Sequence, residues 1–160
     1  DINKLNWFNA AWIRKLSDKE LILRLKPYLK IKISDKQLIK IIPLLKERII
    51  KLTEANELIK FLVKMPEYDK SSFRGNNIKD ELTVVMHYLE KLSKWQAKEI
   101  YPIIKKSFEV DKFNKKDFYT NLYIAIEGRP AGLPLFESME ILGKDEVLLR
   151  LNTALNKLKS

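Results

Sequence analysis

The stretch SDKELILRLKPYL, residues 17–29, decides the fold class of this chain. Its first four residues have the pattern of a capping box. In this device the Ser17 hydroxyl accepts a hydrogen bond from the Glu20 amide, and the Glu20 side chain accepts one from the Ser17 amide. Leu21, Leu25 and Leu29 then follow at intervals of four, so they share one face of a helix. The stretch therefore predicts the start of an amphipathic α-helix.

Apolar residues three and four apart recur along almost the whole chain, and this spacing predicts helices throughout. Only 4 glycines occur in 160 residues, which argues against a β-rich fold with many tight turns. We therefore expect an all-α protein of about nine helices and no strand. In the first half, helices are expected over about 5–15, from Ser17, from Ser34, from Pro43 and from Thr53 to Val63. In the second half, they are expected over about 78–92, 97–110, 114–128, 134–143 and 145–158.

Several residues mark where these helices should begin or end. Ser34, followed by Gln37, repeats the capping pattern of Ser17. Pro43 lacks an amide hydrogen, so it should break or kink the third helix and restart it as a fourth. Asn114 suits a helix start, and Gly128 suits a left-handed helix end.

Residues 65–77, MPEYDKSSFRGNN, form the best linker candidate. They contain a proline, a glycine, two serines and two asparagines, and the helical spacing of apolar residues lapses there. We therefore expect two consecutive small helical subdomains, covering residues 1–70 and 71–160.

The charge is the first indication of a partner. Lysine and arginine number 31 against 21 aspartates and glutamates, which gives a net charge of +10. Residues 1–70 hold 16 of the basic and 9 of the acidic residues. A basic excess suits phosphate backbones, because binding them releases counterions. An AT-rich genome, which encodes lysine and isoleucine freely, explains the composition equally well.

The reactive groups that an active site needs are missing. The chain has no cysteine and a single histidine, His87, so neither zinc-thiolate sites nor cysteine nucleophiles are possible. The phosphate-binding loops GxxxxGK[ST] and GxGxxG are absent, and no apolar run approaches the roughly 18 residues of a membrane span. Most carboxylates have lysines nearby, as on solvated helix faces. The residues indicate a helical binding module without an active site of its own.

Two features go beyond that class. Trp7, Phe8 and Trp12 crowd one helix beside basic residues, and aromatics beside cations can stack unpaired bases. Phe8 and Trp12 lie four apart, which favours a place in the core for these two, whereas Trp7 points elsewhere. The second feature is the loop 128–134, whose glycines and prolines suit either close backbone contact with a ligand or a plain connection between helices.

Four blocks of sequence resemble bacterial glutamyl-tRNA synthetases. Residues 5–17, LNWFNAAWIRKLS, look like the stretch after the KMSKS loop, where that family reads close to KL-x-W-x-N-x-x-Y/W-I-R. LKPYL at 25–29 matches its L-x-P-Y/F-L segment, and LLKER at 44–48 falls where the family has a basic helix ending in arginine. GLPLFE at 132–137 and ILGKDE at 141–146 are similar to its P-LFE…LLG-K/R-E-R close. The blocks keep the family's order and cover essentially the whole chain.

This resemblance implies the anticodon-binding, C-terminal part of a class I glutamate–tRNA ligase. Such an enzyme uses ATP with Mg²⁺ to attach glutamate to its tRNA, in a catalytic domain that carries HIGH and KMSKS motifs. Neither motif is present here, so we expect this part to hold no cofactor and no metal, and the start at Asp1 reads as a cut inside a longer protein. The expected partner is glutamate-specific tRNA, in the cytoplasm, with no membrane association, and the expected state is a monomer.

The resemblance also implies which residues touch the anticodon. Arg48 aligns with the arginine that reads the third anticodon base, where a guanidinium offers paired donors. Trp7 aligns with a tryptophan close to the anticodon stem. Tyr123 stands where some relatives have an arginine beside the middle base, and tyrosine can stack or donate but brings no charge. The loop that contacts the first base aligns with Gly132, Leu133, Pro134 and Leu135, where some relatives have T-P-P before LFE.

Two other interpretations remain open at this point. One is a helical protein–protein interaction domain whose surface is incidentally basic. The other is a general RNA-binding module unconnected with aminoacylation. A salt titration of tRNA binding and a tRNA with a scrambled anticodon loop distinguish these from anticodon reading.

Overall fold

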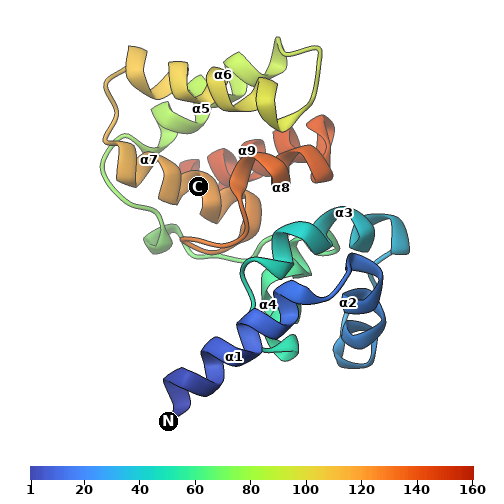
Figure 1. Ribbon diagram of the computed structural model, residues 1–160. Coiled ribbons are helices and arrows are strands. Elements are labelled where there is room, and N and C mark those ends of the chain that lie inside the picture. The colour runs from blue at the N-terminus through green and yellow to red at the C-terminus, as the bar shows by residue number, and fades with distance from the viewer. The chain divides into compact units, whose positions relative to one another are not determined.

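The computed structural model describes all residues from 1 to 160 and contains nine α-helices and no strand (Figure 1). The prediction of an all-α protein is therefore confirmed. The chain divides into two compact units, residues 1–64 and residues 65–160. Each unit has its own buried apolar residues and is described by itself below.

Unit 1, residues 1–64, is the blue and teal part of the ribbon in Figure 1. It contains α1 (Ile2–Lys15), α2 (Asp18–Leu25), α3 (Asp35–Lys46) and α4 (Ala55–Ile59), with 3-10 turns at Lys26–Tyr28, Leu52–Glu54 and Lys60–Leu62. Helices α2 and α3 pack against each other, and α3 also packs against α4. The fully buried side chains of this core include Leu21, Leu25, Leu38, Ile41, Ile42, Leu45 and Ile59.

The capping box at the start of α2 is formed as predicted. The Ser17 Oγ accepts from the Glu20 amide at 3.1 Å, and the Glu20 carboxylate accepts from the Ser17 amide at 2.8 Å. These bonds lower the pKa of Glu20 because they favour its charged form. At the start of α3 only half of the device is present. Ser34 accepts from the Gln37 amide, but the Gln37 side chain accepts from the Ser34 hydroxyl at 3.3 Å and not from the Ser34 amide, and its amide group donates to the Leu62 carbonyl.

Two predictions for the helices of unit 1 are wrong. Pro43 neither ends nor restarts a helix but lies inside α3. Its side chain is exposed, so the carbonyl that loses its amide partner can turn to water while the core positions keep their register. Thr53 caps no helix, because it lies inside the 3-10 turn Leu52–Glu54. The expected helix to Val63 is reduced to α4 and a second 3-10 turn.

Unit 2, residues 65–160, is the green to red part of Figure 1. It contains a 3-10 turn at Lys70–Ser72 and the helices α5 (Ile78–Glu90), α6 (Ala97–Val110), α7 (Lys115–Glu127), α8 (Leu135–Leu142) and α9 (Lys144–Lys159). Helix α5 packs against α6, α7 and α9, and α8 packs against α6 and α9. As predicted, Asn114 caps α7, and Gly128 ends it with a left-handed φ of 78°. The core includes Leu82, Val85, Ile100, Phe118, Leu122, Met139 and Leu151.

The segment 65–77, with the composition of a linker, packs onto unit 2. Phe73 is buried and meets Tyr68 edge to face, with ring centroids 5.2 Å apart. The buried Asn121 side chain accepts from the Arg74 amide at 2.8 Å and donates to the Arg74 carbonyl at 2.9 Å. The units therefore divide between Lys64 and Met65, a few residues before the expected boundary at 70. That each unit takes part in anticodon binding stays a prediction.

Candidate nucleic-acid interface

Arg48 lies in the turn that follows α3, with a fixed backbone and an exposed side chain. Its amide donates to the Leu45 carbonyl at 3.0 Å, and the next residue, Ile49, is fully buried. The neighbouring Glu47 is tied to α1, because Arg14 donates to its carbonyl at 3.3 Å and pairs with its carboxylate at 3.5 Å. The Arg48 guanidinium has no partner within the chain, so it is available to a ligand.

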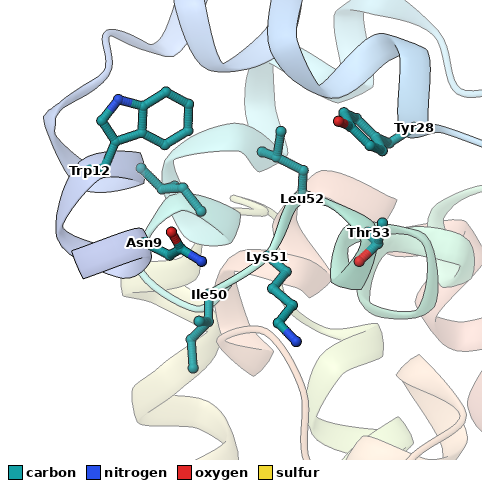
Figure 2. A pocket seen from close by; sticks show the side chains of 8 residues that line it. Asn9, Trp12, Tyr28, Ile50, Lys51, Leu52 and Thr53 are labelled. Carbon is teal, nitrogen blue, oxygen red and sulfur yellow. The ribbon is translucent and has the colours of Figure 1, made fainter. Parts of the chain in front are cut away.

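A pocket of about 310 Å³ opens in unit 1 beside the segment that follows Arg48. Figure 2 shows Trp12 and Asn9 of α1 on one side, Tyr28 and Thr53 on the other, and Leu52 between them. Ile13, Ile50 and Lys51 complete the lining. The pocket thus combines aromatic and aliphatic walls with an amide, a hydroxyl and an ammonium group, and it can accept a planar polar ring.

The aromatic residues of α1 are all exposed. The exposed fractions are 66% for Trp7, 53% for Phe8 and 44% for Trp12. The prediction that Phe8 and Trp12 lie in the core is therefore wrong. The buried face of α1 consists of Ala10 and Ile13 instead, and Figure 1 shows the first half of α1 extending away from α2, α3 and α4.

These exposed rings contact one another and a cation. Trp7 and Phe8 meet edge to face with centroids 5.1 Å apart. The Arg24 guanidinium of α2 lies 5.0 Å from the centre of the Trp12 ring, within the range of a cation–π contact. An aromatic surface held beside arginine is suited to stacking against bases.

The positive charge is concentrated in unit 1. Residues 1–64 hold 15 lysines and arginines against 7 aspartates and glutamates, whereas residues 65–160 hold 16 against 14. Lys30, Lys32, Lys36 and Lys40 are all exposed on the loop before α3 and on its first turns. Such a surface attracts a polyanion over a distance of about one Debye length, roughly 8–10 Å at ordinary salt.

The remaining predicted site residues lie in unit 2. Tyr123, on α7, is partly buried against the core. Leu133 and Leu135 are 0% and 4% exposed, so their side chains are core residues and only their backbone groups could serve a ligand. Pro134, between them, is exposed, as are Pro130 and Ala131 earlier in the loop. Trp7 and Arg48 thus belong to one unit, and Tyr123 and residues 132–135 to the other.

Glu127 is a residue that the sequence analysis missed. It ends α7, is 4% exposed, and accepts from the Leu133 amide through Oε1 at 3.1 Å. Burial raises its pKa to about 8, although the Leu133 amide, Ser138, Arg129 and Arg150 each act to lower it. The three apolar residues before it, at 124–126, are also buried, and this run was the available signal that Glu127 does not lie on a solvated face.

The possible metal ligands, the single histidine and the helix lengths are as follows. No group of three or more histidine, cysteine, aspartate or glutamate residues is placed to hold a metal ion. His87 is exposed on α5, with its ring nitrogen 3.0 Å from Lys91 Nζ. None of the helices has both the length and the apolar character to cross a membrane.

Comparison with known proteins gives concordant results. Residues 20–155 match the family described as the anticodon binding domain. Glutamate–tRNA ligase 1 of Fervidobacterium nodosum is 33% identical over 154 residues, which are 96% of this chain and 32% of that protein. The glutamate–tRNA ligase of Acidothermus cellulolyticus is 36% identical over 172 residues, covering 96% of this chain and 34% of its own. The chain thus spans about a third of the length of these curated relatives.

Solved structures show the same fold. The crystal structure of a glutamate tRNA ligase from Elizabethkingia meningosepticum, in complex with its amino acid, superposes with a TM-score of 0.80 over 96% of this chain and 32% of that one. Glutamate-tRNA synthetase from Elizabethkingia anophelis superposes with a TM-score of 0.72 over 94% and 31%. Both are 23% identical to this chain, so the likeness concerns the arrangement of the helices.

Proposed function

The chain belongs to the anticodon binding domain family, and we propose that it binds the anticodon stem and loop of a tRNA as part of a glutamate–tRNA ligase. The observation that carries this proposal is the family match over residues 20–155, since it covers both units. The basic surface of unit 1 supports it, because phosphates are the main source of affinity for RNA.

Arg48 is the residue that we expect to read the third anticodon base. Its backbone is held by the end of α3 and by the buried Ile49, while its guanidinium is exposed and unpaired. Because the backbone is fixed, only the side chain has to be ordered on binding, and its planar donors match a base edge or a phosphate. The pocket beside the following segment, between Trp12 and Tyr28, offers a place for a base that has left the stack.

The other predicted contacts take different forms. Trp7, with most of its ring exposed, is suited to packing against the anticodon stem. In the loop for the first base, the side chains of Leu133 and Leu135 are buried and the Leu133 amide is bonded to Glu127. The Pro134 ring and the backbone groups of residues 132–135 that are not already bonded therefore remain for the contact. Tyr123 is half-buried, so it contributes an edge or its hydroxyl beside the middle base and no charge.

The chemistry of the ligase belongs outside this chain. We propose that the whole protein attaches glutamate to its tRNA with ATP and Mg²⁺, in the cytoplasm and as a monomer, as the resemblance implies. This part supplies no phosphate-binding loop and no cluster of metal ligands. Its contribution is to recognise the tRNA, so by itself it should bind tRNA and ligate nothing.

A binding experiment with the full chain tests the proposal. The affinity for a glutamate tRNA should fall steeply with salt if phosphates are neutralised. A tRNA with a scrambled anticodon loop should bind more weakly than the cognate tRNA at every salt concentration. Equal binding of both would indicate a general RNA-binding module, and the absence of tRNA binding would indicate a protein–protein interaction domain.

A variant of Arg48 tests the base assignment. Arg48→Gln should lose roughly 1–3 kcal/mol of preference for the cognate third base, as expected for one arginine that reads a base. Arg74→Gln is the matched control, because this exposed arginine of unit 2 loses the same charge without the predicted base contact. If Arg48→Gln distinguishes cognate tRNA from third-base variants as well as the unaltered chain does, the assignment of Arg48 is wrong.

A further inference from the structure

The loop between α7 and α8 is folded around a single side chain. Gly128 turns the chain at the end of α7 with a φ of 78°, and the loop returns over the Glu127 carboxyl group. There the Leu133 amide donates to Glu127 Oε1 at 3.1 Å. A residue at the start of the loop thus supplies the acceptor for a residue near its end, and the bond is buried.

Gly132 shows how closely the carboxyl group and the loop fit. A Cβ atom at this position would lie 2.5 Å from Glu127 Oε1, closer than real Cβ contacts allow. The backbone of Gly132 is not in the left-handed region, in contrast to Gly128. Glycine is therefore required here for space and not for conformation, because the carboxyl group occupies the position of a side chain.

The same contact determines which parts of the loop face outward. Leu133 and Leu135 are buried on either side of the exposed Pro134. The hydrogen bond from the Leu133 amide to Glu127 fixes the direction of the backbone at the start of the segment 133–135. Pro130, Ala131 and Pro134 are left at the surface.

Other polar groups lie near the Glu127 carboxyl group. Arg150, on α9, is 2% exposed and donates to Glu146 Oε1 at 2.8 Å and to the Ile126 carbonyl at 2.7 Å. Glu127 Oε2 and Ser138 Oγ are both buried without a hydrogen bond of good geometry. The hydrogen bond that the Glu127 carboxyl group forms is therefore the one with the Leu133 amide of the loop.

We infer that Glu127 is a positioning residue that holds the 128–134 loop in its binding shape through the Leu133 amide, and so sets the contact with the first anticodon base. The part of the inference that concerns RNA rests on the proposed function. The structural link between Glu127 and the loop does not depend on it. Glu127 itself touches no RNA, because its side chain is buried beneath the loop.

Three variants of the full chain separate the acceptor from the space it fills. Glu127→Gln keeps an accepting oxygen for Leu133, Glu127→Leu keeps similar volume without an acceptor, and Gly132→Ala places a methyl group against the carboxyl oxygen. Each is compared with the unaltered chain for binding of a glutamate-tRNA anticodon stem-loop and of the same RNA with a changed first base. Hydrogen exchange of the Leu133 amide is measured alongside, since it does not depend on RNA.

We expect Glu127→Leu and Gly132→Ala to lose roughly tenfold in first-base discrimination, the equivalent of one lost hydrogen bond. Discrimination at the third base should be unchanged, and Glu127→Gln should behave like the unaltered chain. Full first-base discrimination in Glu127→Leu or in Gly132→Ala would overturn the inference, as would a loss in Glu127→Gln equal to that in Glu127→Leu. If Glu127→Leu does not fold, Gly132→Ala alone decides.

Failure of the proposed function gives a different result. In that case the unaltered chain itself shows no first-base preference. Hydrogen exchange of the Leu133 amide then still tests the link between Glu127 and the loop. Faster exchange of the Leu133 amide in Glu127→Leu, but not in Glu127→Gln, would then support the positioning role without the RNA contact. Unchanged exchange in both variants would overturn it.

Discussion

Replacing Glu127 with glutamine should remove a pH dependence from the stability of unit 2. Burial raises the pKa of this carboxyl group from 4.5 to about 8. Between pH 4.5 and about pH 8, Glu127 of the folded state keeps a proton that the unfolded chain has released. The stabilisation by this proton is complete below about pH 4.5 and is lost as the pH rises through 8. Glutamine resembles the protonated acid in shape and does not titrate, so the variant should lack this loss.

The size of the effect follows from the pKa. For a group that titrates near 8 in the folded state, raising the pH from about 6 to about 8 lowers the free energy of unfolding by about 2 kcal/mol. Little of this is reduced by solvent screening, because the side chain is only 4% exposed. The opposing charges of Arg129 and Arg150 are already contained in the pKa of about 8, so they do not reduce this value further.

Urea unfolding can be followed in unit 2 alone. Trp95 is the one tryptophan of unit 2, and its indole donates to the Met139 carbonyl at 2.8 Å. Changing Trp7 and Trp12 to phenylalanine therefore makes the fluorescence report on this unit. Glu109→Gln is the control, because Glu109 is an exposed carboxylate on α6. If the free energy of unfolding changes with pH in the same way with and without Glu127→Gln, the carboxyl group does not titrate between pH 6 and pH 8 and the reasoning is refuted.

Further predictions concern buried polar contacts, caps and exposed aromatics. Asn121→Ala should lower the free energy of unfolding of unit 2 by about 3 kcal/mol in urea titrations, because it leaves the Arg74 backbone and the buried Glu81 carboxyl group without their partner. An effect below about 1 kcal/mol would show that water replaces these bonds. Ser17→Ala should cost unit 1 about 1 kcal/mol through loss of the capping box, measured by the same method. Trp7→Ala should change stability by less than about 0.5 kcal/mol, because the ring is exposed, and should weaken tRNA binding. Reduced stability with unchanged affinity would make Trp7 a core residue.

Local sequence signals predicted most of the helices because their causes are local. The Ser17 box needs only residues 17–20, and the Asn114 cap and the Gly128 end of α7 need only their own turn of helix. The limits of α6, Ala97–Val110, also agree with the prediction, although no side chain caps this helix. Pro43 was misjudged because its effect depends on its surroundings. A proline on the exposed side of α3 can remain in a helix whose opposite face is held by the core.

The order of the sequence blocks along the chain was enough to indicate the family. The sequence was not enough to predict which side chains are buried and which are exposed. Helical spacing placed Phe8 and Trp12 on one face of α1, but it does not say which face is covered. In the structure Ala10 and Ile13 are buried and the aromatic rings are exposed. Similarly, the resemblance implied contacts by residues 132–135, whereas folding places the side chains of Leu133 and Leu135 in the core.

The linear sequence determines the helical class, the positions of most helix ends and the basic character of the first half. It also shows which catalytic motifs are missing. Each of these depends on composition or on residues within one or two helical turns. Which surfaces remain exposed, where the two units divide, and the role of Glu127 depend on residues that meet only after folding. The 65–77 segment joins unit 2 because Asn121, far along the chain, binds its backbone. Glu127 becomes a buried acid because the loop that follows it closes over its carboxyl group. Burial is a property of the assembled fold, and it is burial that changes the chemistry of these side chains.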